Sequence, residues 1–293
     1  MVASDIAVSV IVPAYNEENS ILTLMESLDQ ALSALSLPYE IIVVDDGSTD
    51  QTPKKIQELS TRLPHLIALT HKKNRGYGAA LKTGIYQSVF DRVMIIDADQ
   101  TYPVEEISRL VEAAKSFDMV VGSRTGPGAH IPFIRRPAKF ILKRLAEFLV
   151  EYKIPDLNSG FRIFDKKIFH RFHRLFPDGF SFTSTLTLIS LSRGYNIEYI
   201  PIKYLARKGK SKIKPIGDTL NFLQLICRTM LYINPLRVFL PASIFFLEFS
   251  LILFIYRVFF SRAFLVSIII TFICGFQLLV IGLLADLIDK RLD

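Results

Sequence analysis

The chain has no tryptophan and only two cysteines among its 293 residues. Cys227 and Cys274 belong to no Cys-x-x-Cys or Cys/His pattern, so the sequence predicts neither a disulfide framework nor a zinc site. Two nucleotide-binding signatures are also missing: the G-x-G-x-x-G fingerprint of dinucleotide folds and the G-x-x-x-x-G-K-S/T phosphate loop. These absences exclude a nicotinamide dehydrogenase and a P-loop enzyme.

Hydrophobic residues are spread unevenly along the chain. They make up 50% of it, mean hydropathy is +0.33, and the excess lies after Asn234. Residues 238–256 carry one charge, Glu248, and residues 264–285 carry none. As a helix, the second stretch would be about 33 Å long at roughly 1.5 Å per residue, enough to cross a hydrocarbon core of about 30 Å. We therefore predict a transmembrane hairpin over residues 236–293, with spans at about 237–260 and 264–286.

Basic residues predict the orientation of this hairpin. The net charge is +7, and Lys and Arg gather just before the first span and just after the second: Arg207, Lys208, Lys210, Lys212, Lys214, Arg228, Arg237, Lys290 and Arg291. By the positive-inside rule, this side faces the cytoplasm. The apolar run at residues 8–12 follows no basic stretch and is too short for a signal peptide. We expect the part of the chain before the hairpin and both termini in the cytoplasm, and a basic surface that suits anionic lipid rather than nucleic acid.

The first part of the chain alternates strand and helix patterns. Strands are expected at residues 8–13, 39–44, 66–70, 92–96 and 119–122, and helices at 20–37, between 52 and 63, at 76–89 and at 103–116. This alternation predicts a mostly parallel α/β sheet within a domain covering residues 1–212. We predict amphipathic helices at the membrane interface over residues 133–152 and 213–235. An ordinary surface helix packed on the sheet is the alternative for residues 133–152.

Two of the predicted strands are followed directly by aspartates. Asp45 and Asp46 follow the second strand, and Asp97 and Asp99 follow the fourth. Ligands of parallel sheets bind beyond the carboxyl ends of the strands, so these four side chains should gather at one rim. Sites built only from carboxylate oxygens suit Mg or Mn, and such an ion can bind a diphosphate. The plainer alternative for each cluster is a solvated turn.

Three other segments carry candidate chemistry. The glycine-rich residues 74–80 precede a helix and could receive a phosphate or ribose at its N-terminus. Asp156 and Arg162 flank a glycine turn that we place outside the sheet core, where a structural ion pair is the alternative. Residues 207–212 form a cationic loop suited to clamping phosphates, or simply to anchoring the chain at the membrane. The five histidines show no metal spacing and are expected at the surface, and Glu248 is expected to pair with the other helix or a neighbouring subunit, or to lie near an interface.

Taken together, these motifs resemble glycosyltransferase family 2. The similarity rests on Val-Pro-Ala-Tyr-Asn-Glu at 12–17, Val-Asp-Asp-Gly-Ser at 44–48, Asn-Arg-Gly-Tyr-Gly-Ala-Ala at 74–80, Asp-Ala-Asp at 97–99, Gly-Ser-Arg at 122–124, Asn-Ser-Gly-Phe-Arg at 158–162 and Arg-Lys-Gly-Lys-Ser-Lys at 207–212. More narrowly, the sequence resembles the polyprenyl-phosphate glycosyltransferases, the group that contains dolichol-phosphate mannosyltransferase. The match covers roughly residues 6–235 in order, and the terminal hairpin fits members of that group.

The resemblance implies a GT-A fold, a nucleotide-sugar donor, Mg or Mn, and a set of site residues. Nucleotide-sugar-binding positions are Pro13, Tyr15, Glu17, Asp45, Asp46, Gly76 and Asp97. The metal positions are Asp97 and Asp99. Phosphate and acceptor positions are Arg124, Arg135, Arg136, Ser159, Arg162, Ser211 and Lys212. Catalytic positions are Asp99, Asp156 and Arg207.

The sequence departs from the family pattern in two places. Relatives with Asp-x-Asp-x-Gln use the glutamine as a further metal ligand, whereas this chain has Thr101 there and Gln100 before it. Coordination should therefore rely on the two aspartates, water and the diphosphate. A serine that follows the paired arginines in dolichol-type relatives is also absent, since Pro137-Ala138-Lys139 stands there. This second departure bears on how the lipid phosphate is bound.

The expected reaction is an inverting transfer of sugar from a UDP- or GDP-sugar to polyprenyl phosphate, whose anionic phosphate attacks without a strong general base. Two other functions stay open: transfer to a glycerolipid, and a non-catalytic membrane scaffold that retains the fold. A processive polysaccharide synthase is disfavoured, because its Gln-x-x-Arg-Trp motif requires a tryptophan that this chain lacks. Glucose, mannose, an amino sugar or an arabinose derivative are all compatible with the motifs, and a homo-oligomer is possible.

Overall fold

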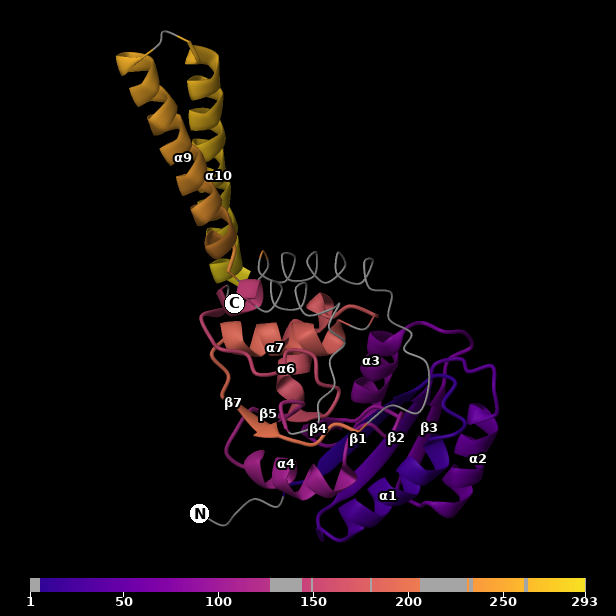
Figure 1. Cartoon of the computed structure of the whole chain (residues 1–293). Helices are drawn as coiled ribbons and strands as arrows, with labels where there is room; N and C mark the ends of the chain where they lie inside the picture. The colour runs from indigo at the N-terminus through magenta and orange to yellow at the C-terminus, as the bar shows by residue number, and fades with distance from the viewer. Residues whose placement is uncertain are drawn as a thin grey trace.

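A seven-stranded sheet organises the body of the protein (Figure 1). The structure, a computed structural model, describes residues 6–126, 144–148, 150–179, 181–205, 231, 234–260 and 263–292, without the side chains of 289–292. The strands are β1 Val8–Ala14, β2 Tyr39–Asp45, β3 Leu66–Thr70, β4 Arg92–Ile95, β5 Met119–Ser123, β6 Arg162–Asp165 and β7 Ile197–Pro201, in the spatial order β3-β2-β1-β4-β6-β5-β7. Only β6 runs antiparallel to its neighbours, β4 and β5.

Helices cover both faces of this sheet (Figure 1). On one face lie α1 Ile21–Ser33, α2 Thr52–Arg62, the short 3-10 helix η1 Val104–Glu106 and α4 Ile107–Ala113. On the other lie α3 Tyr77–Gln87, α6 Lys166–Phe172 with η3 His173–Leu175, and α7 Phe182–Ser192. Apolar residues fill both sides of the central strands, and β1 and β2 are buried along their whole length. The continuous apolar runs of the sequence thus form strands buried on both faces, as such runs predict.

The mostly parallel α/β fold predicted from the sequence is confirmed over the first five strands. The predicted helix at 103–116 is shorter and begins with the 3-10 turn η1. One prediction is wrong: the segment containing Arg162 does not lie outside the sheet core. Arg162 begins β6, which is inserted between β4 and β5 near the middle of the sheet. Strands β6 and β7 and helix α7 had no counterpart among the predicted elements.

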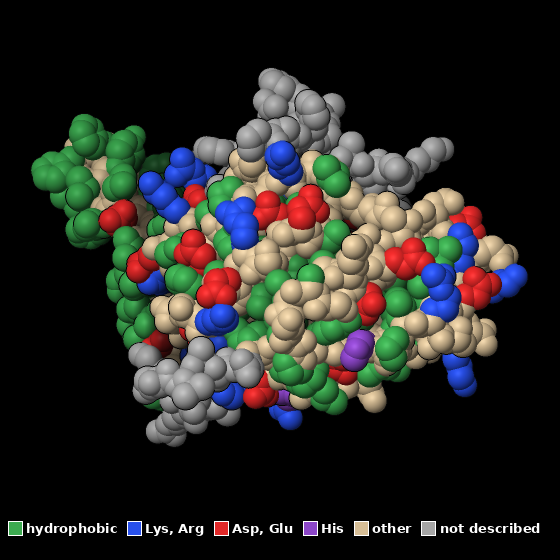
Figure 2. Space-filling model, turned by 90° about the horizontal axis from the view of Figure 1, so that it is seen from below, with side chains coloured by type: hydrophobic (Ala, Val, Ile, Leu, Met, Phe, Trp, Pro, Cys, Tyr) green, Lys and Arg blue, Asp and Glu red, His purple; other side chains and the backbone are tan. Residues whose placement is uncertain are grey.

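A two-helix hairpin projects from the body (Figure 1). Helices α9 Leu236–Phe259 and α10 Leu265–Leu292 coincide with the two apolar stretches and are long and apolar enough to cross a membrane. Their outward surface is almost entirely hydrophobic (Figure 2). The helices approach closely because small residues line their contact: a Cβ on Gly275 would lie 2.8 Å from Leu247 Cγ, and one on Gly282 would lie 2.7 Å from Phe239 Cβ.

The base of the hairpin is fixed to the body. The Arg237 guanidinium, on the first turn of α9, lies 2.6 Å from a Glu151 carboxylate oxygen. Val238 packs against a small apolar cluster formed by Ala146, Ile154 and Leu188, the last of which lies on α7. Because α7 also packs on the sheet, the membrane hairpin and the sheet share one connected set of contacts. The interfacial helices predicted at 133–152 and 213–235 fall mostly outside the described residues.

Candidate functional site

The carboxyl ends of β1 and β2 are tied together at one edge of the sheet. Asp46 N donates to Ala14 O over 2.8 Å, and the loops that follow the two strands are cross-linked. Asn16 N donates to Ser48 Oγ over 2.9 Å, and Glu17 N donates to Thr52 Oγ1 over 2.9 Å. This network places the predicted positions Pro13, Tyr15 and Glu17 beside the end of β2. The first acidic cluster and the motif at 12–17 therefore form one side of the candidate site.

One side-chain oxygen of Asp45 accepts no hydrogen bond from the described residues. Its side chain is 1% exposed, and Oδ1 accepts from Ser48 N over 3.0 Å. Among the described residues, Asp45 Oδ2 has no hydrogen-bond partner. A buried carboxylate oxygen without a donor is costly, so a ligand N–H or O–H is well matched to this position. This agrees with the prediction that Asp45 holds the nucleotide.

Asp46 differs sharply from its neighbour, because internal donors occupy both of its oxygens. Oδ1 lies 2.6 Å from His71 Nδ1 and accepts from Arg75 N over 2.9 Å, and Oδ2 accepts from Gly76 N over 2.7 Å. His71 is buried, 8% exposed, and its Nε2 lies 2.9 Å from Thr83 Oγ1. The prediction that every histidine lies at the surface is therefore wrong for His71. Asp46, for which we also predict contact with the nucleotide, holds the loop before α3 through these bonds.

The N-terminus of α3 is covered by the protein's own backbone, contrary to the predicted phosphate site there. Ala79 N donates to Asp178 O over 3.0 Å. A Cβ on Gly78 would lie 2.2 Å from Pro177 O, and one on Gly76, whose φ is +103°, would lie 2.6 Å from Asp178 O. The glycines of residues 74–80 are thus required for this close approach and for a left-handed turn. The backbone of residues 177–179 takes the place that an anion would need.

Asp97 and Asp99 follow β4 and lie against several polar side chains. Tyr77 Oη donates to Asp97 Oδ1 over 2.8 Å, and Asp99 Oδ1 accepts from Thr101 Oγ1 over 2.6 Å. The Gly160 backbone packs on Asp97, since a Cβ there would lie 2.2 Å from Oδ2. Burial and the nearby Asp97 charge raise the pKa of Tyr77 well above its usual value, so its hydroxyl stays a donor. Sequence reasoning missed Tyr77, although it stands inside a motif that was singled out.

The donor set around Asp97 and Asp99 fits a divalent ion that shares its coordination with a ligand. Two carboxylates two residues apart suit Mg or Mn, but the described residues contain no cluster of three or more potential metal-binding side chains. Gln100 Nε2 donates to Ser20 O over 2.9 Å, away from the aspartates, and Thr101 is fully buried on Asp99. Neither residue therefore replaces the glutamine of Asp-x-Asp-x-Gln relatives. The remaining ligands would come from a diphosphate and water, as the sequence predicts.

Arg124 and Asp156 form a two-point ion pair. Arg124 Nε donates to Asp156 Oδ2 and Nη2 donates to Oδ1, each over 2.8 Å, and Arg124 N also donates to Oδ2. Burial alone would raise the pKa of Asp156, but the hydrogen bonds and charge of Arg124 outweigh it and hold that pKa below its usual value. The ion pair considered for Asp156 and Arg162 is therefore made with Arg124 instead. Asp156 remains ionised near neutral pH and orients the Arg124 guanidinium.

Arg162 and Ser159, predicted to bind phosphate or acceptor, are fully buried. Arg162 donates from Nε and Nη2 to Ser159 O and from Nη1 to Thr183 O and Thr187 Oγ1. Ser159 Oγ donates to Gly122 O over 2.6 Å. Their polar groups hold residues 156–162 onto β5 and α7, because a buried guanidinium must satisfy its donors internally. Both predictions are corrected: these residues shape the loop that carries Asp156 and Gly160.

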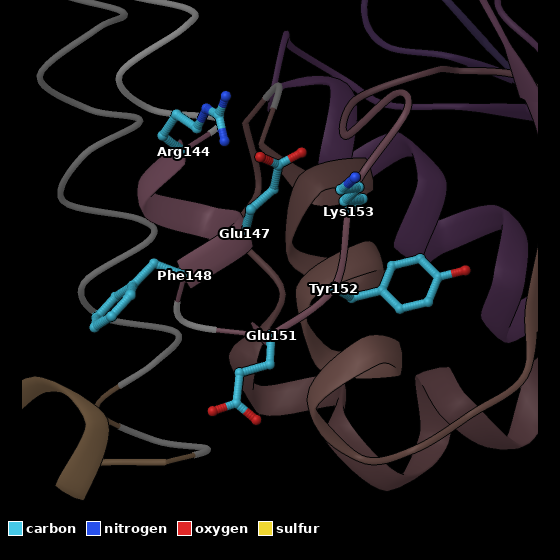
Figure 3. A pocket seen from close by; sticks show the side chains of 6 residues that line it. All are labelled: Arg144, Glu147, Phe148, Glu151, Tyr152 and Lys153. Atoms are coloured by element: carbon cyan, nitrogen blue, oxygen red, sulfur yellow. The ribbon is translucent and has the colours of Figure 1, made fainter.

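An open hollow in the surface of the described residues lies elsewhere. It measures about 400 Å³ near the hairpin base and is lined by Arg144, Glu147, Phe148, Glu151, Tyr152 and Lys153. These side chains point in different directions and do not converge on a common point (Figure 3). The acidic rim, not this hollow, is the candidate site. The predicted positions Arg135, Arg136, Arg207, Ser211 and Lys212 lie outside the described residues.

Comparisons with known proteins identify the family of the chain. Residues 9–172 match the profile "Glycosyl transferase family 2", and residues 234–290 match the profile "GtrB C-terminal hairpin". A dolichyl-phosphate hexose transferase of Haloferax volcanii is 28% identical, over 71% of this chain and 87% of the relative. A dolichol-phosphate mannosyltransferase of Pyrococcus furiosus is 33% identical, over 76% of this chain and 63% of the relative. An undecaprenyl-phosphate 4-deoxy-4-formamido-L-arabinose transferase of Pectobacterium carotovorum is 44% identical, over 39% of this chain and 35% of the relative.

Solved structures share the fold. Glucosyl-3-phosphoglycerate synthase of Mycobacterium tuberculosis, crystallised with Mn²⁺, UDP and phosphoglyceric acid, superposes with a TM-score of 0.58 at 20% identity, over 76% of each chain. Staphylococcus aureus TarS 1-349 with UDP-GlcNAc gives a TM-score of 0.55 at 21% identity, over 77% of this chain and 67% of the other. At these identities the likeness establishes the architecture of the body and nothing finer.

Proposed function

Because the chain belongs to glycosyl transferase family 2, we propose that it moves a sugar from a nucleotide-sugar donor to polyprenyl phosphate at a membrane. The observation that carries the proposal is the joining of an acidic strand-end site to an apolar hairpin in one chain. The named activities of the Haloferax and Pyrococcus relatives, both transfers involving dolichol phosphates, support the same acceptor class. A polyprenyl tail lies in a bilayer, and the hairpin would anchor the body to that bilayer.

The donor would bind across the carboxyl ends of β1, β2 and β4. Asp45 Oδ2 would accept an N–H or O–H of the nucleoside, beside Pro13, Tyr15 and Glu17. Asp97 and Asp99 would hold a divalent ion, Mg or Mn, whose charge would offset that of the leaving diphosphate. The Mycobacterium enzyme was crystallised with Mn²⁺ and UDP, which supports a divalent cation and a nucleotide in general, without locating either in this chain.

The transfer itself needs little from the protein beyond position and charge. An oxygen of the acceptor phosphate bonds to the anomeric carbon while the bond to the diphosphate oxygen breaks, and the nucleoside diphosphate leaves with the electron pair. A phosphate monoester is anionic near neutral pH, so no residue must remove a proton. The Asp156 carboxylate is paired with Arg124, so Asp156 would act by orienting the Arg124 guanidinium towards phosphate oxygens. The predicted acceptor positions Arg135, Arg136, Arg207, Ser211 and Lys212 would add further cations.

The expected topology places the catalytic body in the cytoplasm. The C-terminal end of α10 lies beside the body at the base of the hairpin (Figure 1), so both would lie on one side of a membrane that the hairpin crosses. Basic residues flank this end of the hairpin, as the positive-inside rule requires of a cytoplasmic side.

The test is a transfer assay on the purified full-length chain. The chain would be incubated with polyprenyl phosphate, Mg or Mn, and a panel of labelled UDP- and GDP-sugars. Label in the organic phase would then be counted and compared with that from the D99A variant. Label that requires both Asp99 and the acceptor phosphate supports the proposal and identifies the sugar. Transfer to a glycerolipid or only to water would overturn the acceptor assignment. Nucleotide binding without any transfer would instead indicate a scaffold.

A further inference from the structure

Gln100, which directly follows Asp99, has an unfavourable backbone conformation. Its φ is +58°, in the left-handed region. Among non-glycine residues, asparagine, aspartate and histidine adopt this region most often, and glutamine has no such preference. Five of the described non-glycine residues have a positive φ, and two of them, Asn16 and Gln100, lie in the loops that follow β1 and β4 at the candidate site. Strained conformations persist where the surrounding structure holds them, so the contacts of Gln100 indicate what its strain supports.

The side chain of Gln100 is fastened to the first turn of α1. Gln100 Nε2 donates to Ser20 O over 2.9 Å, and the same carbonyl accepts from Leu24 N over 3.0 Å. Ser20 is itself fixed, because it is buried and its Oγ donates to Glu17 Oε2 over 3.0 Å. Leu24 is buried in the core between α1 and the sheet. The Gln100 amide is therefore bound to a point that cannot shift unless α1 moves.

The backbone of Gln100 determines where the Asp99 carboxylate lies. Thr101 N donates to Asp99 Oδ1 over 3.2 Å, and Thr101 Oγ1 donates to the same oxygen over 2.6 Å. A hydrogen bond from an aspartate side chain to the N–H two residues later closes a turn around the residue between them, which here is Gln100. Thr101 is fully buried and so is a fixed partner. A different conformation at Gln100 would separate Thr101 from Oδ1 and turn the carboxylate.

We propose that Gln100 is a positioning residue for the divalent ion: its amide holds the strained turn that orients Asp99. The inference rests on the ion site proposed above at Asp97 and Asp99. The glutamine of Asp-x-Asp-x-Gln relatives binds the metal itself, whereas Gln100 stands one place earlier and acts through Asp99. Partners that orient a metal ligand commonly matter for affinity without touching the ion.

A purely structural role for the same hydrogen bond makes a different prediction. If the Gln100 amide only tied the loop after β4 to α1, its loss would lower the unfolding midpoint and leave the ion affinity of the folded chain unchanged. If the amide positions Asp99, its loss lowers ion affinity in chains that remain folded. The two roles are therefore separated by measuring ion binding and thermal unfolding on the same variants.

Mn²⁺ titration of the purified full-length chain with UDP or GDP present, followed by electron paramagnetic resonance, tests the proposal. Q100M keeps the length of the side chain but removes the donor, and it should weaken Mn²⁺ binding by about 10-fold. Q100G also lacks the donor, but glycine adopts the left-handed turn without strain, so it should recover part of that loss. Nucleotide binding measured in EDTA should be unchanged in both variants, because Gln100 acts through the ion ligand Asp99.

Two matched controls separate this effect from general consequences of the substitutions. Gln30 is an exposed glutamine on α1, the helix to which Gln100 is fastened, and Q30M should bind Mn²⁺ like the wild-type chain. Ser36 is exposed, follows the other end of α1 and has a φ of +52°, so S36G relieves a similar strain outside the site. S36G should also leave Mn²⁺ binding unchanged.

Three results would overturn the inference while leaving the ion site intact. They are equal Mn²⁺ affinity in Q100M and the wild-type chain, Q100G that binds no better than Q100M, and a lowered unfolding midpoint in Q100M with unchanged ion affinity. A wild-type chain that binds no Mn²⁺ in the presence of UDP or GDP would instead overturn the proposed ion site, and the inference with it.

Discussion

The two acidic strand ends, which look alike in the sequence, do different things in the structure. After β2, Asp46 binds three internal donors, while Asp45 keeps one oxygen without a described partner. After β4, Tyr77 Oη donates to Asp97 Oδ1, and Thr101 donates to Asp99 Oδ1. In the first cluster the protein's own donors occupy Asp46, whereas we propose that Asp45 accepts from the nucleotide and that both carboxylates of the second cluster hold an ion. The role of a carboxylate at the sheet rim therefore depends on which hydrogen-bond donors the fold places beside it.

The largest expected effect comes from removing charge after β4. D97N and D99N should each reduce sugar transfer by about a thousandfold, since stabilisation of a leaving diphosphate by an ion is worth several kcal/mol. The unfolding midpoint should change little, because each side chain is only partly buried. Mn²⁺ titration followed by electron paramagnetic resonance, with nucleotide present, would report the loss of the ion directly. Tight Mn²⁺ binding by both variants would contradict the assignment.

Next in size is the contrast between D46N and D45N. D46N removes a charged acceptor from His71 Nδ1 and two backbone N–H groups, and it should lower the free energy of unfolding by about 2–4 kcal/mol. D45N should leave the unfolding midpoint nearly unchanged but weaken nucleotide binding, because its second oxygen is kept for a ligand. Thermal unfolding and calorimetric titration with UDP and GDP measure both effects. Equal destabilisation by the two substitutions would erase the distinction between these neighbours.

A smaller effect is expected at Tyr77. Y77F removes the hydroxyl that fixes Asp97 Oδ1, and it should weaken Mn²⁺ binding about 10- to 100-fold, as loss of an outer-sphere partner does. Y86F is the matched control: Tyr86 lies on the same helix, α3, and its side chain is 57% exposed. The control should bind Mn²⁺ like the wild-type chain. Unchanged binding by Y77F would mean that packing of Gly160 alone orients Asp97.

The sequence predicted the first half of the body well because its signals are local. Buried strands such as residues 41–44 and helices closed by proline, as at Pro38 and Pro64, are recognisable without knowledge of their partners. Strand β6 is four residues long and antiparallel, and its position between β4 and β5 depends on pairings distant in the chain. No periodicity within four residues could indicate this. The apolar helices α9 and α10, in contrast, coincide with stretches visible from hydropathy alone.

The candidate site was predictable in location but not in detail. Asp45, Asp97 and Asp99 lie at strand ends, and a rule about parallel sheets is enough to place them together. The family resemblance assigned Arg162 to phosphate or acceptor binding, yet α7 supplies carbonyl and hydroxyl acceptors that hold it inside. His71 is similar: its burial depends on Asp46 and Thr83, which are 25 and 12 residues away. Roles set by distant partners require the folded structure.

Asp156 adds a fifth carboxylate to the comparison, and the pH dependence that we expect from it near neutral pH is the smallest of these effects. Its folded-state pKa lies below the unfolded value of about 3.9, so its ionised form stabilises the fold. That contribution is fully present above about pH 4 and is lost as the pH falls through the folded pKa. The difference in unfolding midpoint between the wild-type chain and D156N should therefore stay constant from about pH 5 to 8 and shrink only in acid. Transfer rates should likewise show no ionisation of Asp156 in that range, because Arg124 keeps the carboxylate charged. A step near pH 6 in the rate profile of the wild-type chain that is absent from D156N would contradict this expectation. It would show that Asp156 titrates during the reaction and acts on the ligand directly.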